Sequence, residues 1–145
     1  MKACIIDASV AAKWLLPAAG EPLAEEALEL LQEHVEGRLR MSVPDLFWAE
    51  LANILWKAVR MRRLPEDAAE KALQSAMNRE FPTIPSHALL EDAFALAKAF
   101  DRPVYDSLYV AAAVRLDCPL ITADERLATA LAPYLPVKSL ASLRR

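Results

Sequence analysis

Short apolar runs without internal alternation constrain the fold of this chain more than any other feature. Two of them, at 3–6 and 120–122, are followed within two residues by an aspartate. A strand with one face in water alternates apolar and polar side chains, whereas a strand of a parallel sheet lies between helices and is apolar throughout. Less regular runs at 38–43, 81–84 and 137–140 are also typical of strands. The sequence therefore predicts a central, mainly parallel sheet.

Helical periodicity fills the segments between these runs. Because strands alternate with helices at this spacing, we expect a three-layer α/β/α sandwich. The 145 residues, 55% of them hydrophobic, are enough for one core, so we expect a single domain over residues 1–145. Apolar positions that the periodicity assigns to inner helix faces include Val35, Met77 and Leu116. The expected helices cover 10–16, 21–36, 44–62, 64–79, 87–100, 106–116 and 124–135.

Four acidic residues stand out by their positions. Asp7 directly follows the expected strand 3–6, Asp124 comes two residues after the expected strand 120–122, and Asp106 opens an expected helix. Glu50 is the only charge between positions 45 and 57, where its neighbours are apolar, and Asn53 follows one turn later. A carboxylate within an apolar stretch is costly unless it is paired, hydrogen-bonded or bound to a metal. In a parallel sheet, Asp7 and Asp124 would lie at the same edge, where such folds keep their ligand crevice.

Each of these acids also has an ordinary structural explanation. Asp7 can be a turn or capping acid, and Ser9 can also cap the helix that follows the first strand. Glu50 can lie exposed on a narrow polar stripe that Asn53 shares. Thr122 and Glu125 form a capping-box pattern, which places Asp124 in the first helical turn, where an acid is favoured anyway. Asp106 can likewise cap its own helix. The functional interpretation therefore depends on the four acids as a set.

Several converging carboxylates without balancing cations repel one another, and some of them take up protons. A hard divalent cation such as Mg²⁺ or Mn²⁺ removes this conflict, because it prefers oxygen ligands. Such an ion can activate a water molecule, polarise a phosphoryl oxygen and stabilise a leaving oxygen. Hydrolysis of a phosphodiester is the reaction that most often needs all three.

Other chemistries fit the sequence less well. Two glycines in the whole chain leave no room for a glycine-rich phosphate loop. The nucleophile-elbow pattern of Ser hydrolases is absent. A phosphatase that forms an aspartyl-phosphate would need a second Asp two residues after Asp7, where Ser9 stands. A receiver domain would need an acidic pair after the first strand, which is also missing.

Four segments of the chain resemble the PIN-domain ribonucleases, in particular the toxins of bacterial and archaeal VapBC toxin–antitoxin systems. The segments are IIDASVAAKWLL with Asp7 and Ser9, VPDLFWAELANIL with Glu50, PVYDSLYVAAAV with Asp106, and LITADERLA with Asp124. They occur in the family's order and spacing, and the resemblance covers essentially the whole chain.

The resemblance implies a metal-dependent endoribonuclease in which Asp7, Glu50, Asp106 and Asp124 gather Mg²⁺ or Mn²⁺. Three further residues would act in support: Ser9, Thr122 and Asn53. It also implies a homodimer, and an antitoxin whose C-terminal segment lies in a groove and blocks the site. The helix that carries Phe47, Trp48 and Trp56 is one candidate for that groove or for the dimer contact, and plain core packing is the alternative.

The net charge of −3 leaves RNA binding to a few local cations. Lys13, Arg102, Arg126 and the cluster 60–63 are the candidates, and the sequence does not rank them. No apolar run is long enough to span a membrane, and no signal segment follows Met1, so we expect a cytoplasmic protein.

Two further interpretations remain open at the level of the sequence. The first is a housekeeping PIN nuclease that processes RNA without an antitoxin. The second is a non-catalytic module whose acidic pocket holds an arginine of a partner protein. Cys4 and Cys118 lack the spacing of metal ligands, and a disulfide between them requires that their strands be neighbours.

Overall fold

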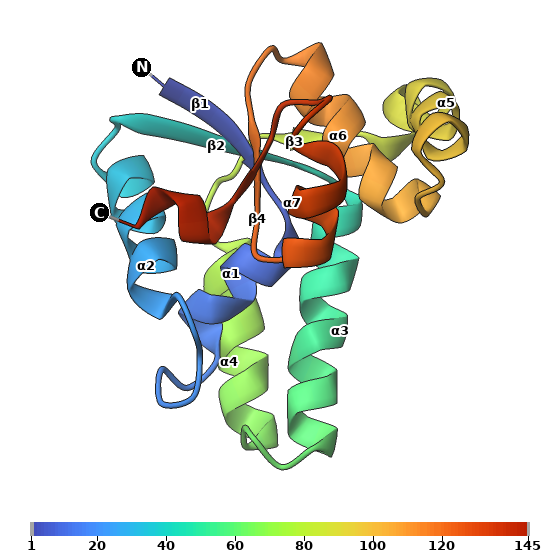
Figure 1. The fold of residues 1–145 in the computed structure, drawn as a ribbon. Coiled ribbons are helices and arrows are strands. Elements are labelled where there is room, and N and C mark those ends of the chain that lie inside the picture. Colours follow the sequence, from blue (N-terminus) through green and yellow to red (C-terminus); the bar gives the residue numbers. More distant parts are fainter. Residues whose placement is uncertain (1, 145) are drawn as a thin grey trace.

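The structure, a computed structural model, describes residues 2–144. The five strands in this part of the chain form one parallel sheet in the order β3-β2-β1-β4-β5 (Figure 1). β1 lies in the centre, and its residues 4–6 are buried, as a strand covered on both faces must be. The strands span Lys2–Ile6 (β1), Leu39–Pro44 (β2), Thr83–Ile84 (β3), Leu120–Thr122 (β4) and Val137–Ser139 (β5).

Seven α-helices connect these strands, and none of those in the described part of the chain is both long and apolar enough to cross a membrane. Residues 2–144 also contain two short 3₁₀ helices, η1 (Ser86–Leu89) and η2 (Leu140–Leu143). The α-helices span Ala8–Leu15 (α1), Ala24–Val35 (α2), Leu46–Arg60 (α3), Glu66–Met77 (α4), Leu90–Phe100 (α5), Val104–Arg115 (α6) and Glu125–Leu131 (α7).

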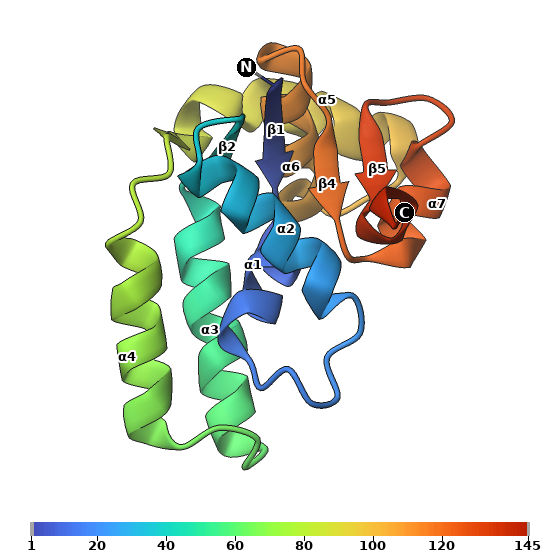
Figure 2. The ribbon, with the colours of Figure 1, turned by 90° about the vertical axis from the view of Figure 1, so that its left-hand side faces the viewer.

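Helices cover both faces of the sheet. α2 and η2 lie over one face, and α6 lies behind the other with α5 outside it (Figure 2). Because α6 is sandwiched between the sheet and α5, residues 107–113 are all buried and the helix has no solvated stripe. The predicted three-layer sandwich with a central parallel sheet is therefore confirmed.

The helix that carries Glu50 starts two residues later than the sequence predicts. Pro44 still belongs to β2, and Asp45 precedes the first residue of α3. The Asp45 carboxylate accepts hydrogen bonds from the backbone N–H of Ser86, at 3.0 Å, and from its hydroxyl, so it ties α3 to η1. From there α3 runs beyond the sheet and pairs with α4 in a helical hairpin that projects from the body (Figures 1 and 2).

An aromatic cluster fixes the upper part of α3 against the body. Phe47 is fully buried and packs edge-to-face on Trp48, with ring centroids 4.9 Å apart, and on Phe81, at 6.3 Å. His34 also packs on Phe81, and its Nδ1 accepts the backbone N–H of Met41 at 3.0 Å. This packing holds Glu50, one turn after Phe47, at a fixed place beside the sheet.

Candidate active site

The candidate site lies at the topological switch point of the sheet, where the order in which the chain adds strands reverses. From β1 the chain winds outwards to β2 and β3 on one side, and later to β4 and β5 on the other. Parallel α/β sheets bind ligands in the crevice beyond the carboxyl ends of the strands at such a point. Asp7 directly follows β1, and Asp124 lies two residues after the end of β4. Because β1 and β4 pair in parallel, the two acids are at the same edge, as expected.

The structure brings all four singled-out acids to one small cavity of about 160 Å³. They come from four separate elements: the start of α1, the second turn of α3, the first turn of α6 and the start of α7. The lining residues are Asp7, Ala8, Ser9, Glu50, Ile54, Asp106, Tyr109, Asp124 and Leu127.

Asp7 is the most deeply placed of the four, with 8% of its surface exposed. Its Oδ1 accepts hydrogen bonds from the Ser9 hydroxyl at 2.5 Å and from the Val10 backbone N–H at 3.3 Å. Its Oδ2 accepts one from the Thr122 hydroxyl at 2.5 Å. Burial raises the pKa of Asp7 to about 6, although these three donors act in the opposite direction. The carboxylate is therefore held rigidly, and it is costly to ionise.

Glu50 is half-buried, and its Oε1 accepts a hydrogen bond from the hydroxyl of Tyr109 on α6. Burial raises the pKa of Glu50, and the nearby charge of Asp106 raises it further. Burial and the contact with Glu50 raise the pKa of the Tyr109 phenol above its ordinary value, so this hydroxyl stays a donor. Tyr109 therefore joins α3 to α6 inside the site.

The other two acids lie nearer the solvent. Asp106 accepts a hydrogen bond from Nη2 of Arg102 at 3.3 Å. Burial raises the pKa of Asp106, and the positive charge of Arg102 opposes that rise. Asp124 is exposed, and its Oδ1 accepts the backbone N–H groups of Arg126, at 3.0 Å, and Leu127, at 3.2 Å. Asp124 is thus fixed by the start of α7.

The structure confirms one of the ordinary explanations of these acids and corrects two others. Asp7 caps α1, as that explanation predicts, so Ser9 does not. Asp124 caps α7 itself, so the Thr122–Glu125 pattern does not. Asp106 does not cap α6, because it is the third residue of that helix. Asp7 and Asp124 act as the caps because each is the extended residue before its helix. From there its carboxylate can reach the first free backbone N–H groups.

Ser9 and Thr122 instead join the two sides of the site. Ser9 lies within α1, donates to Asp7 and accepts the backbone N–H of Ala123 at 3.1 Å. Thr122 is fully buried, donates to Asp7 and accepts the backbone N–H of Asp124 at 3.0 Å. Asn53, the third proposed supporting residue, is exposed on α3 and does not line the cavity.

Tyr109 lines the cavity, but it was not among the site residues that the sequence suggested. The available indication was its spacing: Tyr109 follows Asp106 by three positions, and residues so spaced share one side of a helix. Its bond to Glu50 joins positions that are 59 residues apart, and only the packing of α3 against α6 reveals it.

The donor set of this cavity suits a hard divalent cation, because it consists of carboxylate and hydroxyl oxygens without sulfur or imidazole. Within residues 2–144, no three carboxylate, imidazole or thiol groups lie close enough together to form a ready-made metal site. The carboxylates are instead held by their own donors, and those of Asp7, Glu50 and Asp106 have raised pKa values. A cation among them would favour their ionised forms, so the residues fit such an ion chemically.

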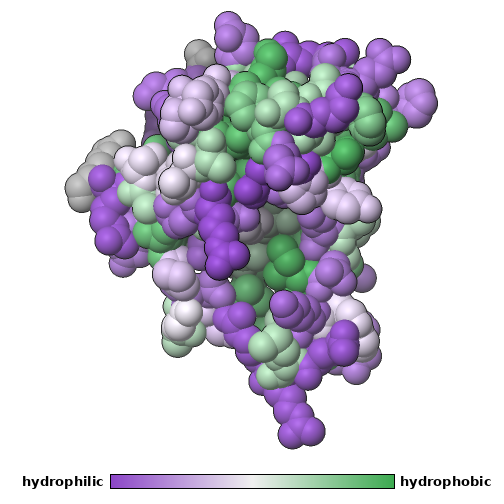
Figure 3. Space-filling model, turned by 45° about the vertical axis from the view of Figure 1, so that its right-hand side comes forward, coloured by the Kyte–Doolittle hydropathy of each residue, from purple (hydrophilic) through white to green (hydrophobic). Residues whose placement is uncertain are grey.

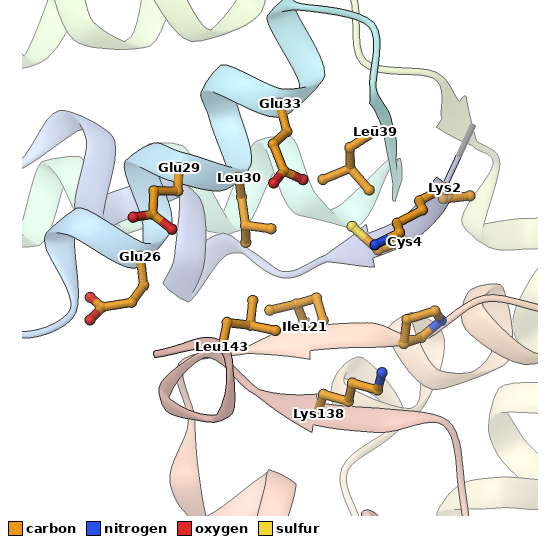
Figure 4. A pocket seen from close by; sticks show the side chains of 12 residues that line it. Lys2, Cys4, Glu26, Glu29, Leu30, Glu33, Leu39, Ile121, Lys138 and Leu143 are labelled. Carbon is orange, nitrogen blue, oxygen red and sulfur yellow. The ribbon is translucent and has the colours of Figure 1, made fainter. Parts of the chain in front are cut away.

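A second hollow, of about 280 Å³, lies away from the four acids, between α2 and the sheet (Figure 4). Glu29 and Glu33 of α2 face it from one side, and Lys2 and Lys138 from the other. Cys4 lies on its floor. Cys4 and Cys118 are both free and buried, and burial raises the pKa of the Cys4 thiol to about 12. Neither thiol lines the acidic cavity.

The chain is similar in sequence to known proteins. Residues 4–130 match the model of the PIN domain family. Ribonuclease VapC3 of Pyrobaculum aerophilum is 35% identical over 127 residues, which are 86% of this chain and 91% of that protein. Ribonuclease VapC1 of Mycobacterium tuberculosis is 34% identical over 140 residues, which are 94% of this chain and 95% of that protein.

Solved structures show the same fold. PAE2754 from Pyrobaculum aerophilum aligns with a TM-score of 0.70 at 20% identity, over 98% of this chain and 93% of that one. A toxin–antitoxin complex from Klebsiella pneumoniae aligns with a TM-score of 0.60 at 18% identity, over 94% and 97%. The family match covers most of the chain, and two ribonucleases share about a third of its residues. This chain therefore belongs to the PIN-domain family.

Proposed function

We propose that this protein is a metal-dependent endoribonuclease and the toxin of a toxin–antitoxin pair. The observation that carries the proposal is the convergence of Asp7, Glu50, Asp106 and Asp124 on one cavity at the switch point of the sheet. Its similarity to ribonucleases named VapC supports RNA as the substrate and the cytoplasm as the place of action.

The chain's own residues supply the framework for catalysis. The hydroxyls of Ser9 and Thr122 orient both oxygens of Asp7, and the Tyr109 hydroxyl orients Glu50. Bound Mg²⁺ or Mn²⁺ would supply Lewis acidity at the scissile phosphate and activate a water molecule. The four carboxylates would hold the ion, and the half-buried setting of Glu50 and Asp106 leaves their oxygens accessible from the cavity.

A cleavage assay with a matched variant tests the catalytic proposal. We expect the purified protein to cut a structured RNA mixture with Mg²⁺ or Mn²⁺, and the Asp106→Asn variant to lose this activity. Asp92→Asn is the control, because Asp92 is also the third residue of its helix but is exposed and does not line the cavity. Equal cleavage by all three proteins would point to a contaminating ribonuclease and remove the support for the site.

The antitoxin proposal has a defined candidate surface. Phe47 is buried in the core and therefore inaccessible to a partner protein. Trp48 is half-buried, and its indole N–H donates to the Thr83 hydroxyl at 3.2 Å. Trp56, by contrast, is 54% exposed beside a shallow groove between α3 and α4. This groove, lined by apolar residues such as Leu55 and Leu73 and flanked by acids of α4, suits the apolar face of an antitoxin segment.

The antitoxin and the homodimer are tested together. A neighbouring reading frame that encodes a small DNA-binding protein identifies the antitoxin, and Trp56→Ala should weaken its binding. Light scattering of the purified protein measures whether it is a dimer. If the Trp56→Ala variant keeps both its affinity for the antitoxin and its oligomeric state, the α3–α4 groove is not the contact.

A further inference from the structure

A line of polar side chains leads away from the site along α3. Asn53, Lys57 and Arg60 follow Glu50 at intervals of three, seven and ten residues, so they lie on the same side of the helix. All three are exposed. We call Glu50, Asn53, Lys57 and Arg60 the α3 stripe. At 1.5 Å per residue, Lys57 and Arg60 lie about 10 and 15 Å along the axis from Glu50.

The charge of this region is opposite to that of the whole chain. Positions 51–65 hold four basic residues and no acidic one, although the chain has a net charge of −3. Of the four, Arg63 pairs with Glu21 at 2.8 Å. Lys57 and Arg60 form no ion pair with any residue in 2–144. The stripe therefore ends in two cations whose charge is not neutralised by the fold.

The helical hairpin places Lys57 and Arg60 along a surface that leads to the site. α3 begins beside the acidic cavity and carries the stripe out along the projecting hairpin (Figure 1). The space-filling view shows hydrophilic side chains over the far end of this hairpin (Figure 3). A chain molecule that enters the cavity can thus continue along α3.

Other basic residues near the site are already engaged. The Lys13 ammonium contacts Glu21 at 3.4 Å and the carbonyl of Pro22 at 2.7 Å, and its side chain is only 9% exposed. Arg102 contacts Asp106 at 3.3 Å. A polyanion that reaches the cavity therefore finds free positive charge on the α3 stripe and at Arg126 on α7, which forms no ion pair among residues 2–144.

We propose that the α3 stripe binds the phosphate backbone of single-stranded RNA on one side of the cleaved bond, with Lys57 and Arg60 each contacting a phosphate. The proposal rests on the ribonuclease function proposed above. Two cations spaced along one line match the repeating charge of an extended strand, whereas a single small anion would need only one of them. The side-chain amide of Asn53, between them and Glu50, can hydrogen-bond a ribose hydroxyl.

The salt dependence of RNA binding tests this directly. Each phosphate contact to a single strand contributes about 0.7 to the slope of log K against log salt. The Lys57→Gln/Arg60→Gln variant should therefore lower that slope by about 1.4. The probe is a short, unstructured, fluorescein-labelled RNA, and anisotropy is measured in a background that carries Asp106→Asn to prevent cleavage.

The matched control removes the same charge elsewhere. Arg40→Gln/Lys71→Gln changes two exposed cations. Arg40 lies near the amino end of β2, whereas the acidic cavity lies beyond the carboxyl ends of the strands, and Lys71 lies on α4. This variant should keep the slope of the parent. In the cleavage-competent protein, Lys57→Gln/Arg60→Gln should raise the KM for RNA and leave kcat unchanged, because these side chains do not line the cavity.

The possible results separate the two proposals. An unchanged slope and KM in a protein that still cleaves RNA would overturn the α3 stripe and leave the ribonuclease intact. An unchanged slope together with a changed molecular mass would identify the stripe as a contact between copies of the chain, which also overturns it. If the parent neither binds nor cleaves RNA, both proposals fail.

Discussion

The buried carboxylate of Asp7 makes a quantitative prediction about stability. Folding raises its pKa from 3.8 to about 6, mainly because the group is removed from water. At 1.36 kcal/mol per unit of pKa, ionised Asp7 costs the metal-free fold about 3 kcal/mol. An Asn at this position cannot ionise, and its amide oxygen can still accept the Ser9 and Val10 donors. We therefore expect Asp7→Asn to abolish cleavage and yet stabilise the protein at neutral pH.

The sign of the pH dependence follows from proton binding. Between about pH 4 and pH 6, the folded state holds a proton on Asp7 that the unfolded state has lost. The free energy of unfolding of the parent should therefore fall by about 3 kcal/mol as pH rises through this window. Below pH 4 both states are protonated, so the parent and Asp7→Asn should be almost equally stable there. Glu50 and Asp106 titrate in both proteins, and the difference between the two curves isolates Asp7.

Urea unfolding followed by tryptophan fluorescence, in EDTA and across this pH range, measures both curves. Asp124→Asn is the control, because Asp124 also caps a helix but is exposed, and Asn caps a helix about as well as Asp. At every pH, the free energy of unfolding of Asp124→Asn should be close to that of the parent. A parallel pH dependence for the parent and Asp7→Asn would refute the reasoning, as would a variant that is less stable at neutral pH. Added Mg²⁺ should stabilise the parent and not Asp7→Asn.

Four further variants probe separate parts of the site and core. Thr122→Val should cost about 2 kcal/mol at pH 8 and less at pH 4, because its hydroxyl donates to a carboxylate that is protonated in acid; urea unfolding at both pH values measures this. Tyr109→Phe should lower kcat with little change in the KM for RNA, since the buried hydroxyl contacts Glu50 and not the solvent; steady-state cleavage separates the two. Phe47→Ala should cost about 4 kcal/mol of stability and Trp56→Ala only about 0.5, and equal losses would mean that the α3 core is assigned wrongly.

The sequence was sufficient to predict where the acids meet, because strand ends and the parallel arrangement follow from short-range patterns. Asp7 and Asp124 each follow an apolar run, and a parallel sheet brings such positions to one edge. The partners of these acids were not predictable in the same way. Either Ser9 or Asp7 can cap α1 on local grounds, and only the residue at which the strand ends decides between them.

The inner and outer faces of helices were predicted less well at helix ends, and where a helix packs on an element that the sequence did not indicate. Val35, Met77 and Leu116 fit the apolar periodicity, but they lie at or just beyond helix ends and are exposed. The middle of α6 shows the opposite case, because α5 buries the side that periodicity alone would leave in water. Asn53 was grouped with the site by its spacing from Glu50, yet its side chain is exposed and does not line the cavity, whereas that of the neighbouring Ile54 does.

The bond between Thr122 and Asp7 spans 115 positions of the chain, and it has a consequence for the order in which activity arises during synthesis. A growing chain carries Asp7, Glu50 and Asp106 well before β4 is made. Until β4 pairs with β1, Asp7 lacks its Thr122 donor and Asp124 is absent. Because such distant pairings form late and slowly, a nascent or truncated chain cannot cut RNA before its last strands are in place. The cell therefore has the whole period of translation and folding in which to provide an inhibitor before the first active molecule appears.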